Sequence, residues 1–304
     1  MATVVVLGGG VGGLVAANEL RKRLGREHRV VLVDKEGRHL FAPALLWLMV
    51  GARRPEGIVR DLAPLERKGI EVLRGQVQAL NPERKKAQVD GREVKGDFLI
   101  VSLGADLAPE QIPGLAGAGY NLYSLEGASA LRDARTGLTA GHLVVLVART
   151  PFKCPAAPYE AALILDHDLR RSGVRGRVSI SLYTPEPQPM PVAGPEVGAA
   201  LRGLLEARCI EFFPQHSVAE VDPGGRSIRF ANGAQAAFDL LAYVPPHIVP
   251  PVVKASGLTG EAPWVPVERH TMATRFPGVY AIGDVAVIPL AHGLPLPKAG
   301  VFAR

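Results

Sequence analysis

Residues 3–14 read Thr-Val-Val-Val-Leu-Gly-Gly-Gly-Val-Gly-Gly-Leu, an apolar run that leads directly into glycines. The β-branched run Thr3 to Leu7 predicts a buried strand, and glycines follow it at once. The Ala- and Leu-rich run Leu14 to Leu24 predicts a helix, and Arg29 to Asp34 predicts a second strand. Together these segments form a β-α-β unit of about thirty residues, the usual size of such a unit.

The glycines of this unit fit a dinucleotide site. Gly8, Gly10 and Gly13 satisfy G-x-G-x-x-G, and Asp34 ends the next strand at about the 20-residue distance that such sites have. The first glycine permits a tight turn, the second lets a pyrophosphate approach the backbone, and the third lets the helix pack on the strand. The helix N-terminus favours phosphate groups. We expect Asp34 to accept hydrogen bonds from ribose hydroxyls and Lys35 to line the same site; the alternative is a glycine-rich turn that binds nothing.

The composition is that of an ordinary globular chain of 304 residues, 47% hydrophobic and 21% charged, which is long enough for two domains. The net charge of +6 is scattered, which favours anionic ligands or an anionic membrane surface over nucleic acid. The apolar run Leu40 to Gly51 is shorter than the ~20 residues that span a bilayer. Two cysteines fit a reducing compartment. We therefore expect a cytoplasmic protein, at most peripheral on the inner face of the cytoplasmic membrane. The dispersed histidines predict no metal site.

A second α/β unit begins at strand His142 to Val147, continues through a turn to a helix from about Tyr159 to Arg171, and reaches strand Val178 to Tyr183. Further elements are expected at Gly69–Leu73, Lys86–Val89, Asp97–Ser102, Glu196–Arg208, Ile210–Phe213 and Gly278–Asp284. We predict an α/β fold with two Rossmann-like dinucleotide-binding domains. The first takes residues 1–107 and 240–304, and the second, which carries Cys154, takes residues 108–239.

Two short segments resemble flavoprotein disulfide-reductase-like enzymes. Residues 101–105 (Val-Ser-Leu-Gly-Ala) resemble the strand-end turn of these enzymes, and residues 280–284 (Tyr-Ala-Ile-Gly-Asp) resemble their late strand, whose Asp holds the ribityl chain of FAD. The resemblance implies that Gly104, Gly283 and Asp284 contact FAD. For Asp284, the alternative is an N-cap on the following segment.

The turn of the second unit lacks the glycines that a second dinucleotide would need. Residues 148–160 contain no glycine, and Pro151, Pro155 and Pro158 stiffen the turn and lack N–H groups. Such a turn cradles a pyrophosphate poorly. NADH is therefore disfavoured as the electron donor.

Residues 151–160 (Pro-Phe-Lys-Cys-Pro-Ala-Ala-Pro-Tyr-Glu) closely resemble the sulfide:quinone oxidoreductase and flavocytochrome c sulfide dehydrogenase group. The resemblance extends to residues 185–191 and 296–303. It implies that Cys154 carries sulfur between sulfide and the flavin, that Lys298 lies near the flavin ring or the quinone pocket, and that sulfide and a quinone are the partners. No cysteine lies in residues 39–51, where the flavocytochrome branch attaches its flavin, so non-covalent FAD is expected.

The position of Cys154 also favours redox chemistry on physical grounds. Cys154 follows Lys153 and precedes a helix, and both neighbours favour the thiolate. Glu160 could accept the proton of sulfide, although a first-turn acid that complements the helix dipole is an equal alternative. For Cys154, the alternative is a small buried hydrophobe. Cys209 ends a helix where glycine is common, and we expect a structural role.

One feature of the family is expected to be missing. The second redox cysteine of the family lies in a C-terminal segment beyond the motif that ends at Ala303, and this sequence ends at Arg304. Three hypotheses follow: a sulfide:quinone reductase-like enzyme, an NADH:quinone-type oxidoreductase, or a truncated FAD-binding protein without turnover.

Overall fold

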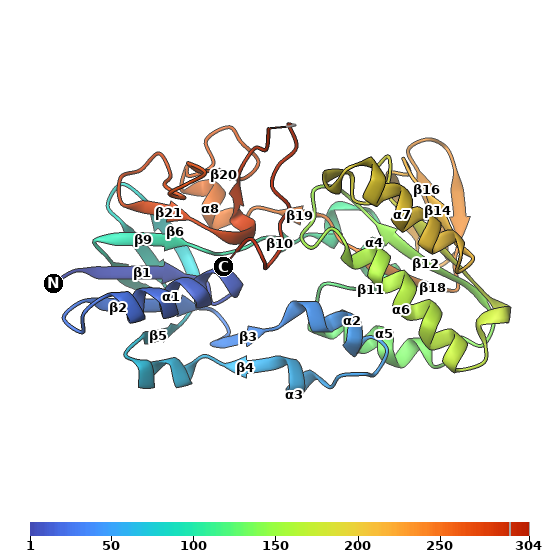
Figure 1. Cartoon of the computed structure of the whole chain (residues 1–304), viewed down its shortest axis with the longest axis horizontal. Helices are drawn as coiled ribbons and strands as arrows, with labels where there is room; N and C mark the ends of the chain where they lie inside the picture. The colour runs from blue at the N-terminus through green and yellow to red at the C-terminus, as the bar shows by residue number, and fades with distance from the viewer. Residues whose placement is uncertain (292, 304) are drawn as a thin grey trace. The chain divides into compact units, whose positions relative to one another are not determined.

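The chain divides into two compact units in the computed structural model, which describes residues 1–291 and 293–303. Unit 1 comprises Met1–Leu40, Val59–Asp106 and Ile248–Arg304, and unit 2 comprises Phe41–Ile58 and Leu107–His247. Figure 1 shows the chain leaving unit 1 for unit 2 and returning. These bounds differ from the expected domains in three places, because residues 41–58, Leu107 and residues 240–247 belong to unit 2.

Unit 1 is built on a parallel five-stranded sheet with the strand order β21-β9-β1-β2-β5. Its strands are β1 (Thr3–Leu7), β2 (Arg29–Asp34), β5 (Glu71–Arg74), β9 (Phe98–Val101) and β21 (Val279–Ala281), and α1 (Val11–Arg23) follows β1. Alternate residues of β1 face opposite sides: Val5 and Leu7 join one apolar core, and Val6 joins the other. Both faces are therefore covered, as is usual for parallel sheets.

Smaller elements complete unit 1. They are the antiparallel strands β6 (Val77–Asn81), β7 (Lys86–Val89) and β8 (Arg92–Lys95), the pair β3 (Arg38–Leu40) and β4 (Val59–Asp61), the pair β20 (Val265–Pro266) and β22 (Ala286–Val287), helix α8 (Pro251–Ala255), and the 3-10 helices η2 (Ala63–Lys68) and η6 (Gly283–Val285).

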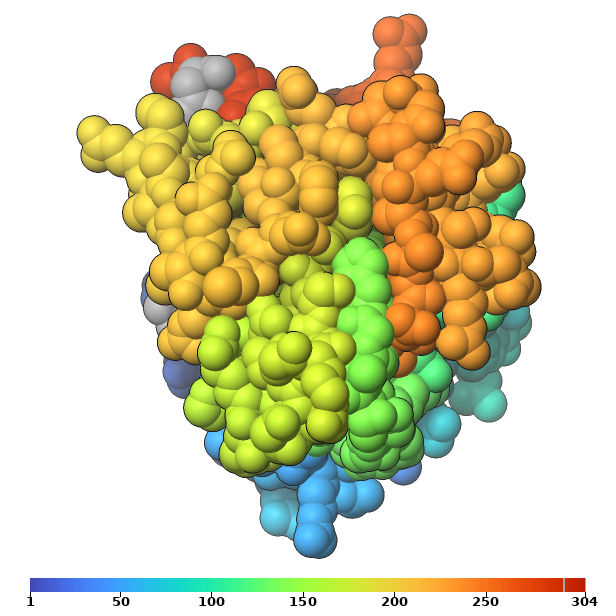
Figure 2. Space-filling view, turned by 90° about the vertical axis from the view of Figure 1, so that its right-hand side faces the viewer, coloured from blue at the N-terminus to red at the C-terminus, as the bar shows by residue number. Residues whose placement is uncertain are grey.

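Unit 2 contains a second parallel sheet with the strand order β11-β18-β12-β13-β14. The strands are β11 (Tyr120–Asn121), β12 (Gly141–Val147), β13 (Val178–Tyr183), β14 (Ile210–Phe213) and β18 (Leu240–Val244). Its helices are α2 (Leu45–Leu48), α3 (Pro55–Ile58), α4 (Leu115–Ala118), α5 (Leu125–Arg135), α6 (Ala157–Arg171) and α7 (Pro195–Glu206), and a small antiparallel sheet holds β15 (Val218–Asp222), β16 (Ser227–Phe230) and β17 (Gln235–Ala237). In Figure 2, residues of α7 (yellow), of the turn after α6 (yellow-green) and of these last strands (orange) share one face of the unit.

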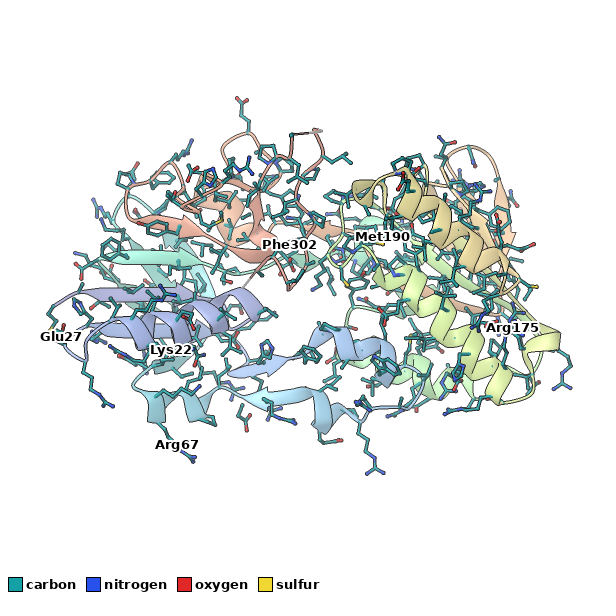
Figure 3. The ribbon with its side chains drawn as sticks, viewed as in Figure 1. Lys22, Glu27, Arg67, Arg175, Met190 and Phe302 are labelled. Atoms are coloured by element: carbon teal, nitrogen blue, oxygen red, sulfur yellow. The ribbon has the colours of Figure 1, made fainter. Side chains whose placement is uncertain are left out.

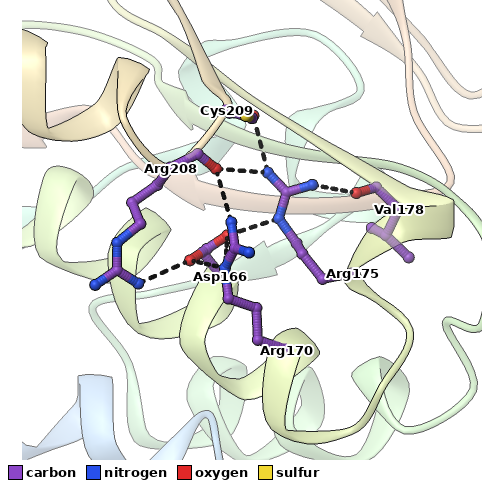
Figure 4. Close-up of polar contacts among 6 residues, drawn as sticks. All are labelled: Asp166, Arg170, Arg175, Val178, Arg208 and Cys209. Atoms are coloured by element: carbon purple, nitrogen blue, oxygen red, sulfur yellow. Dashed lines mark hydrogen bonds and ion pairs between the residues drawn. The ribbon is translucent and has the colours of Figure 1, made fainter.

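A buried carboxylate joins the ends of α6 and α7. Asp166 is 0% exposed and bonds Arg170, Arg175 and Arg208 (Figure 4). Burial alone would raise the pKa of Asp166, but hydrogen bonds from Arg170 and Arg175 lower it on balance. The Arg175 guanidinium also donates to the backbone of Val178 and Cys209, so this network fixes three segments of unit 2.

Residues 41–58 belong to unit 2 because α2 packs on α5 and α6 and because Arg135 binds this segment. The Arg135 guanidinium donates to the carbonyls of Met49 (2.9 Å) and Val50 (2.7 Å) and pairs with the buried carboxylate of Asp168. The sequence did not indicate this contact, because the partners are 86 and 85 residues apart.

Several predicted elements have their expected bounds, namely those at Thr3–Leu7, Arg29–Asp34, Lys86–Val89, Val178–Tyr183 and Ile210–Phe213. The strand predicted over Gly278–Asp284 was too long. Gly278 and Gly283 have positive φ, so the strand covers only Val279–Ala281 and Asp284 lies in η6. None of the helices within the described residues is long and apolar enough to cross a membrane.

Candidate functional site: two strand-end turns

Two glycines of the first turn are required by packing. Gly8 has φ +103, and a Cβ there would lie 2.2 Å from the carbonyl oxygen of Ser102. A Cβ on Gly13 would lie 1.8 Å from the carbonyl oxygen of Gly8, so α1 can approach β1 only without a side chain at this position. This close packing of helix on strand is the role that the glycine spacing predicts for Gly13.

Gly10 is different, because a Cβ at this position would meet nothing within 4 Å. Gly10 precedes α1, and its side of the helix N-terminus carries no acidic residue and no side-chain cap. Free N–H groups and the positive end of the helix dipole suit a phosphate. The space beside Gly10 thus fits the pyrophosphate of a dinucleotide, and no contact among the described residues requires a glycine here.

Asp34 lies at the end of β2, where its carboxylate joins two loops. One oxygen accepts from the Gly9 N–H (2.8 Å), and the other accepts from the N–H groups of Glu36 (3.0 Å) and Gly37 (2.9 Å). A carboxylate has about four lone-pair sites, so it can still accept a further donor. Lys35 is exposed next to it.

His39 belongs to the same corner, although its position in the sequence gave no sign of it. Its Nδ1 lies 3.0 Å from the carbonyl oxygen of Gly9. A carbonyl accepts, so this contact requires the tautomer with a proton on Nδ1. His39 thereby supports the turn that Gly8 and Gly10 form.

The carboxyl ends of β9 and β21 lie at the same sheet edge as the glycine turn, because these strands run parallel to β1. Ser102 follows β9 and is buried, and its hydroxyl is 3.0 Å from the place of a Gly12 Cβ. Gly104 (φ +70) has open space where a Cβ would stand, and Gly283 (φ +72) precedes Asp284. Asp284 is the second residue of η6, whose N-cap is Ile282, so the N-cap alternative for Asp284 is wrong.

Lys298 is held beside Asp284. Its ammonium group donates to the carbonyls of Asp284 (2.5 Å) and Ala286 (3.1 Å) and lies 3.6 Å from the centroid of the buried Trp264 ring. Burial lowers the pKa of Lys298 to about 8, against a smaller opposing effect of Asp284. A pocket of about 40 Å³ adjoins these groups and includes Phe302, which is labelled in Figure 3.

The second turn, in unit 2, connects β12 to α6. Cys154 is half-buried and has φ +52, an uncommon conformation for a residue with a side chain. Its carbonyl accepts from the Ala157 N–H (2.9 Å) and from the Tyr123 hydroxyl (3.2 Å). Neither Cys154 nor the exposed Cys209, which has φ +54 just after α7, forms a disulfide.

Glu160 lies on the first turn of α6 and is exposed, the position in which an acid complements a helix N-terminus. Its neighbour Tyr159 is buried and donates to Glu186 at 2.5 Å, and the Thr184 hydroxyl also contacts Glu186 (3.2 Å). Burial raises the pKa of both Glu186 and Tyr159. Sequence reasoning missed this cluster, since Glu186 stands in a proline-rich loop that includes Met190 (Figure 3).

The structure therefore assembles the sequence-predicted residues in two groups. Unit 1 brings together Gly8, Gly10, Gly13, Asp34, Lys35, Gly104, Gly283, Asp284 and Lys298. Unit 2 carries Cys154 and Glu160 six residues apart around the start of α6.

A parallel sheet with a glycine turn, an open helix N-terminus and an acid after the second strand defines a dinucleotide-binding oxidoreductase fold. The match to known families agrees. The chain belongs to the family described as pyridine nucleotide-disulphide oxidoreductase, which matches residues 2–296 and consists of FAD-dependent oxidoreductases.

Individual relatives narrow the resemblance. The chain is 29% identical over 301 residues to the mitochondrial sulfide:quinone oxidoreductase of Mus musculus, covering 94% of this chain and 66% of that protein. The solved sulfide:quinone oxidoreductase of Aquifex aeolicus superposes with a TM-score of 0.86 at 24% identity, over 95% of this chain and 70% of that one. An alternative NAD(P)H-ubiquinone oxidoreductase of Arabidopsis thaliana is 24% identical, over 99% of this chain and 64% of the relative.

These findings confirm the resemblance that the three sequence segments indicated. The chain spans just under two thirds of the length of the mouse relative.

Proposed function

We propose that this chain oxidises sulfide through Cys154 and bound FAD, with a quinone as the electron acceptor. The observation that carries the proposal is the turn between β12 and α6. It has no glycine for a second pyrophosphate, and it presents a half-buried cysteine at a strained position where a parallel strand leads into a helix. A nucleophile on such a turn is exposed to reactants at the sheet edge.

Residues of unit 1 would hold the cofactor. The α1 N-terminus beside Gly10 would bind the pyrophosphate, Asp34 the ribose, and Asp284 the ribityl chain, with Lys35, Gly104 and Gly283 lining the site. Bound FAD supplies a two-electron acceptor.

The sulfur step would need bound FAD as its two-electron oxidant. Cys154 would supply the thiolate: hydrosulfide would lose its proton and form a sulfur–sulfur bond to it, and the two electrons released would reduce the flavin, which would leave a persulfide on Cys154. The exposed carboxylate of Glu160 can take the proton to solvent. Lys298, whose pKa is lowered to about 8, can exchange a proton with the acceptor near neutral pH.

A lipid-soluble acceptor would require contact with a membrane. The surplus of basic residues, +6 overall, suits an anionic membrane surface. We therefore propose peripheral contact with the inner face of the cytoplasmic membrane, to be tested by cosedimentation with anionic vesicles.

Anaerobic addition of sulfide and of NADH separates the candidate functions. The proposal expects the flavin absorbance to bleach with sulfide and to persist with NADH. Bleaching with NADH instead would favour the second candidate, an NAD(P)H-dependent quinone reductase. The similarity to the Arabidopsis relative supports this candidate. Bleaching with neither would indicate an FAD-binding protein without turnover.

A further inference from the structure

Three neighbouring strands of unit 2 bring three residues to one sheet edge. Strands β11, β18 and β12 are adjacent and parallel, and Tyr123, His247 and Cys154 follow their carboxyl ends. Such ends meet at one edge. Tyr123 contacts both of the other residues there: its ring meets the His247 ring edge-on, with 5.2 Å between centroids, and its hydroxyl donates to the backbone carbonyl of Cys154 at 3.2 Å.

The Cys154 backbone needs such support. A left-handed φ of +52 is costly for a residue with a Cβ, and residues in this conformation persist where their surroundings hold them. The Ala157 N–H, at 2.9 Å, supports the Cys154 carbonyl from within the same turn. The Tyr123 hydroxyl reaches the same carbonyl from 31 residues away, so it ties the turn to another strand of the sheet.

Tyr123 is itself firmly placed. Its side chain is buried, and its own N–H donates to the Asn121 side chain at 2.8 Å. On one side, Leu122 bonds the carbonyl of Tyr243 in β18; on the other, Ser124 caps α5. The Lys153 ammonium lies 6.0 Å from the centre of the Tyr123 ring. Tyr123, held by these bonds, thus reaches the Cys154 carbonyl with its hydroxyl and the Lys153 ammonium with its ring.

We propose that Tyr123 is a positioning residue for Cys154. Its hydroxyl fixes the carbonyl of the left-handed residue and thereby the direction in which the thiol points. The positioning itself depends only on contacts of the turn. Its role in the reaction rests on the proposed sulfide oxidation.

Tyr123→Phe isolates the hydroxyl, because the ring and its contacts with His247 and Lys153 remain. The rate of iodoacetamide alkylation is measured for each cysteine across a pH series by peptide mass spectrometry. We expect the rate at Cys154 to rise at least about threefold and its pH profile to shift, because the loosened turn exposes the thiol. The rate at Cys209, in the same molecule, should not change. Tyr243→Phe, which removes the hydroxyl of another buried tyrosine of this sheet, is the matched control and should behave as the wild type.

The second measurement is anaerobic reduction of the flavin by sulfide in the same variants. In Tyr123→Phe, loss of the fixed geometry should slow the reduction of the flavin by sulfide at least about tenfold, while alkylation of Cys154 becomes faster. A general loss of stability would not speed alkylation of Cys154 while it slowed flavin reduction, and it would also change the alkylation rate of Cys209.

The outcomes are distinguishable. An unchanged alkylation profile of Cys154 in Tyr123→Phe overturns the positioning role, whether or not sulfide reduces the flavin. A shifted profile with sulfide reduction at the wild-type rate overturns its service to the reaction. If sulfide fails to reduce the wild-type flavin, the proposed function falls, and the alkylation result alone decides the role of Tyr123.

Discussion

Gly10 and Gly13 lie three positions apart in one turn, but the space for a Cβ differs between the two positions. A Cβ on Gly13 would overlap the Gly8 carbonyl, whereas a Cβ on Gly10 would meet no atom of the described residues within 4 Å. The fold therefore explains Gly13, whereas the open space at Gly10 agrees with the proposed pyrophosphate site.

The two substitutions should consequently fail in different ways. Gly10→Val should lower the FAD content per chain at least about tenfold, because the side chain occupies the pyrophosphate position. Gly13→Ala should destabilise the FAD-free protein by about 1–3 kcal/mol, the usual cost of overpacking. FAD is quantified after acid release, and unfolding in urea is measured on FAD-free protein. Full FAD content in Gly10→Val would show that the space beside Gly10 is not the pyrophosphate site.

Lys298 gives stability a specific dependence on pH. Burial lowers its pKa from 10.5 to about 8, so between these values the unfolded chain binds more protons than the folded one. The free energy of unfolding should therefore rise with pH in this interval, by at most about 1.4 kcal/mol per pH unit from this group. Lys298→Met should lack this contribution. The difference between the two urea-unfolding series isolates Lys298 from other titrating groups, and parallel series would contradict the burial of its ammonium group.

At the scale of elements, the strand–turn–helix segments β1–α1 and β12–α6 have the same topology but different residues in their turns. The turn between β1 and α1 is glycine-rich and opens onto a helix N-terminus, whereas the turn between β12 and α6 is glycine-free and carries Cys154. Each turn connects a strand of a parallel sheet to a helix. The two turns therefore differ in their residues and not in their topology.

The glycine-free turn predicts how the flavin responds to nicotinamide cofactors. Three prolines supply no N–H groups to a second pyrophosphate. Under anaerobic conditions, NADH and NADPH should therefore reduce the flavin at least about a hundredfold more slowly than sulfide at equal concentration. Stopped-flow absorbance checks this, with free FAD as the control for non-enzymatic reduction. Stoichiometric reduction by NADH within the time of the sulfide reaction would show that the turn binds a dinucleotide after all.

At the scale of the whole molecule, the chain alternates between the two units, and residues 41–58 belong to unit 2 although unit 1 flanks them in sequence. Arg135 donates to two backbone carbonyls of this segment and also pairs with the carboxylate of Asp168 on α6, which is 5% exposed. Arg171 also pairs with Asp168, but its own side chain is 68% exposed.

Arg135→Met should destabilise unit 2 by about 3–5 kcal/mol, because a buried carboxylate loses its main partner. Arg171→Met, the exposed partner of the same acid, should cost no more than about 1 kcal/mol. Urea unfolding followed by circular dichroism gives both values. Equal effects of the two substitutions would contradict the role of Arg135 as the anchor of residues 41–58.

The sequence predicted much of this fold for a simple reason. Strands such as Arg29–Asp34 are continuous apolar runs bounded by polar residues, so local pattern alone sets their limits. Residues 41–58 and 240–247 were placed in the wrong domain because their partners, α5 and β12, are distant in the sequence. The strand over Gly278–Asp284 was predicted too long because positive φ at Gly278 and Gly283 cannot be seen in a composition pattern.

The candidate site shows the same division. The glycines and Asp34 were found from spacing, because a β-α-β unit fixes their geometry. Tyr123, His39 and Glu186 were missed, since each reaches its partner across a fold-level contact of 27 to 31 residues. Resemblance indicated Cys154 and Lys298, but the left-handed backbone of Cys154 and the Trp264 contact of Lys298 required the structure.

Entry of sulfur through Cys154 is tested by the rate of anaerobic flavin reduction by sulfide in Cys154→Ser and Cys209→Ser. A serine hydroxyl stays protonated near neutral pH and cannot act as the sulfur nucleophile. We predict that Cys154→Ser retains FAD but loses sulfide-dependent reduction by at least about a thousandfold, while Cys209→Ser reduces at the wild-type rate. Reduction of the Cys154→Ser flavin at the wild-type rate would contradict the account.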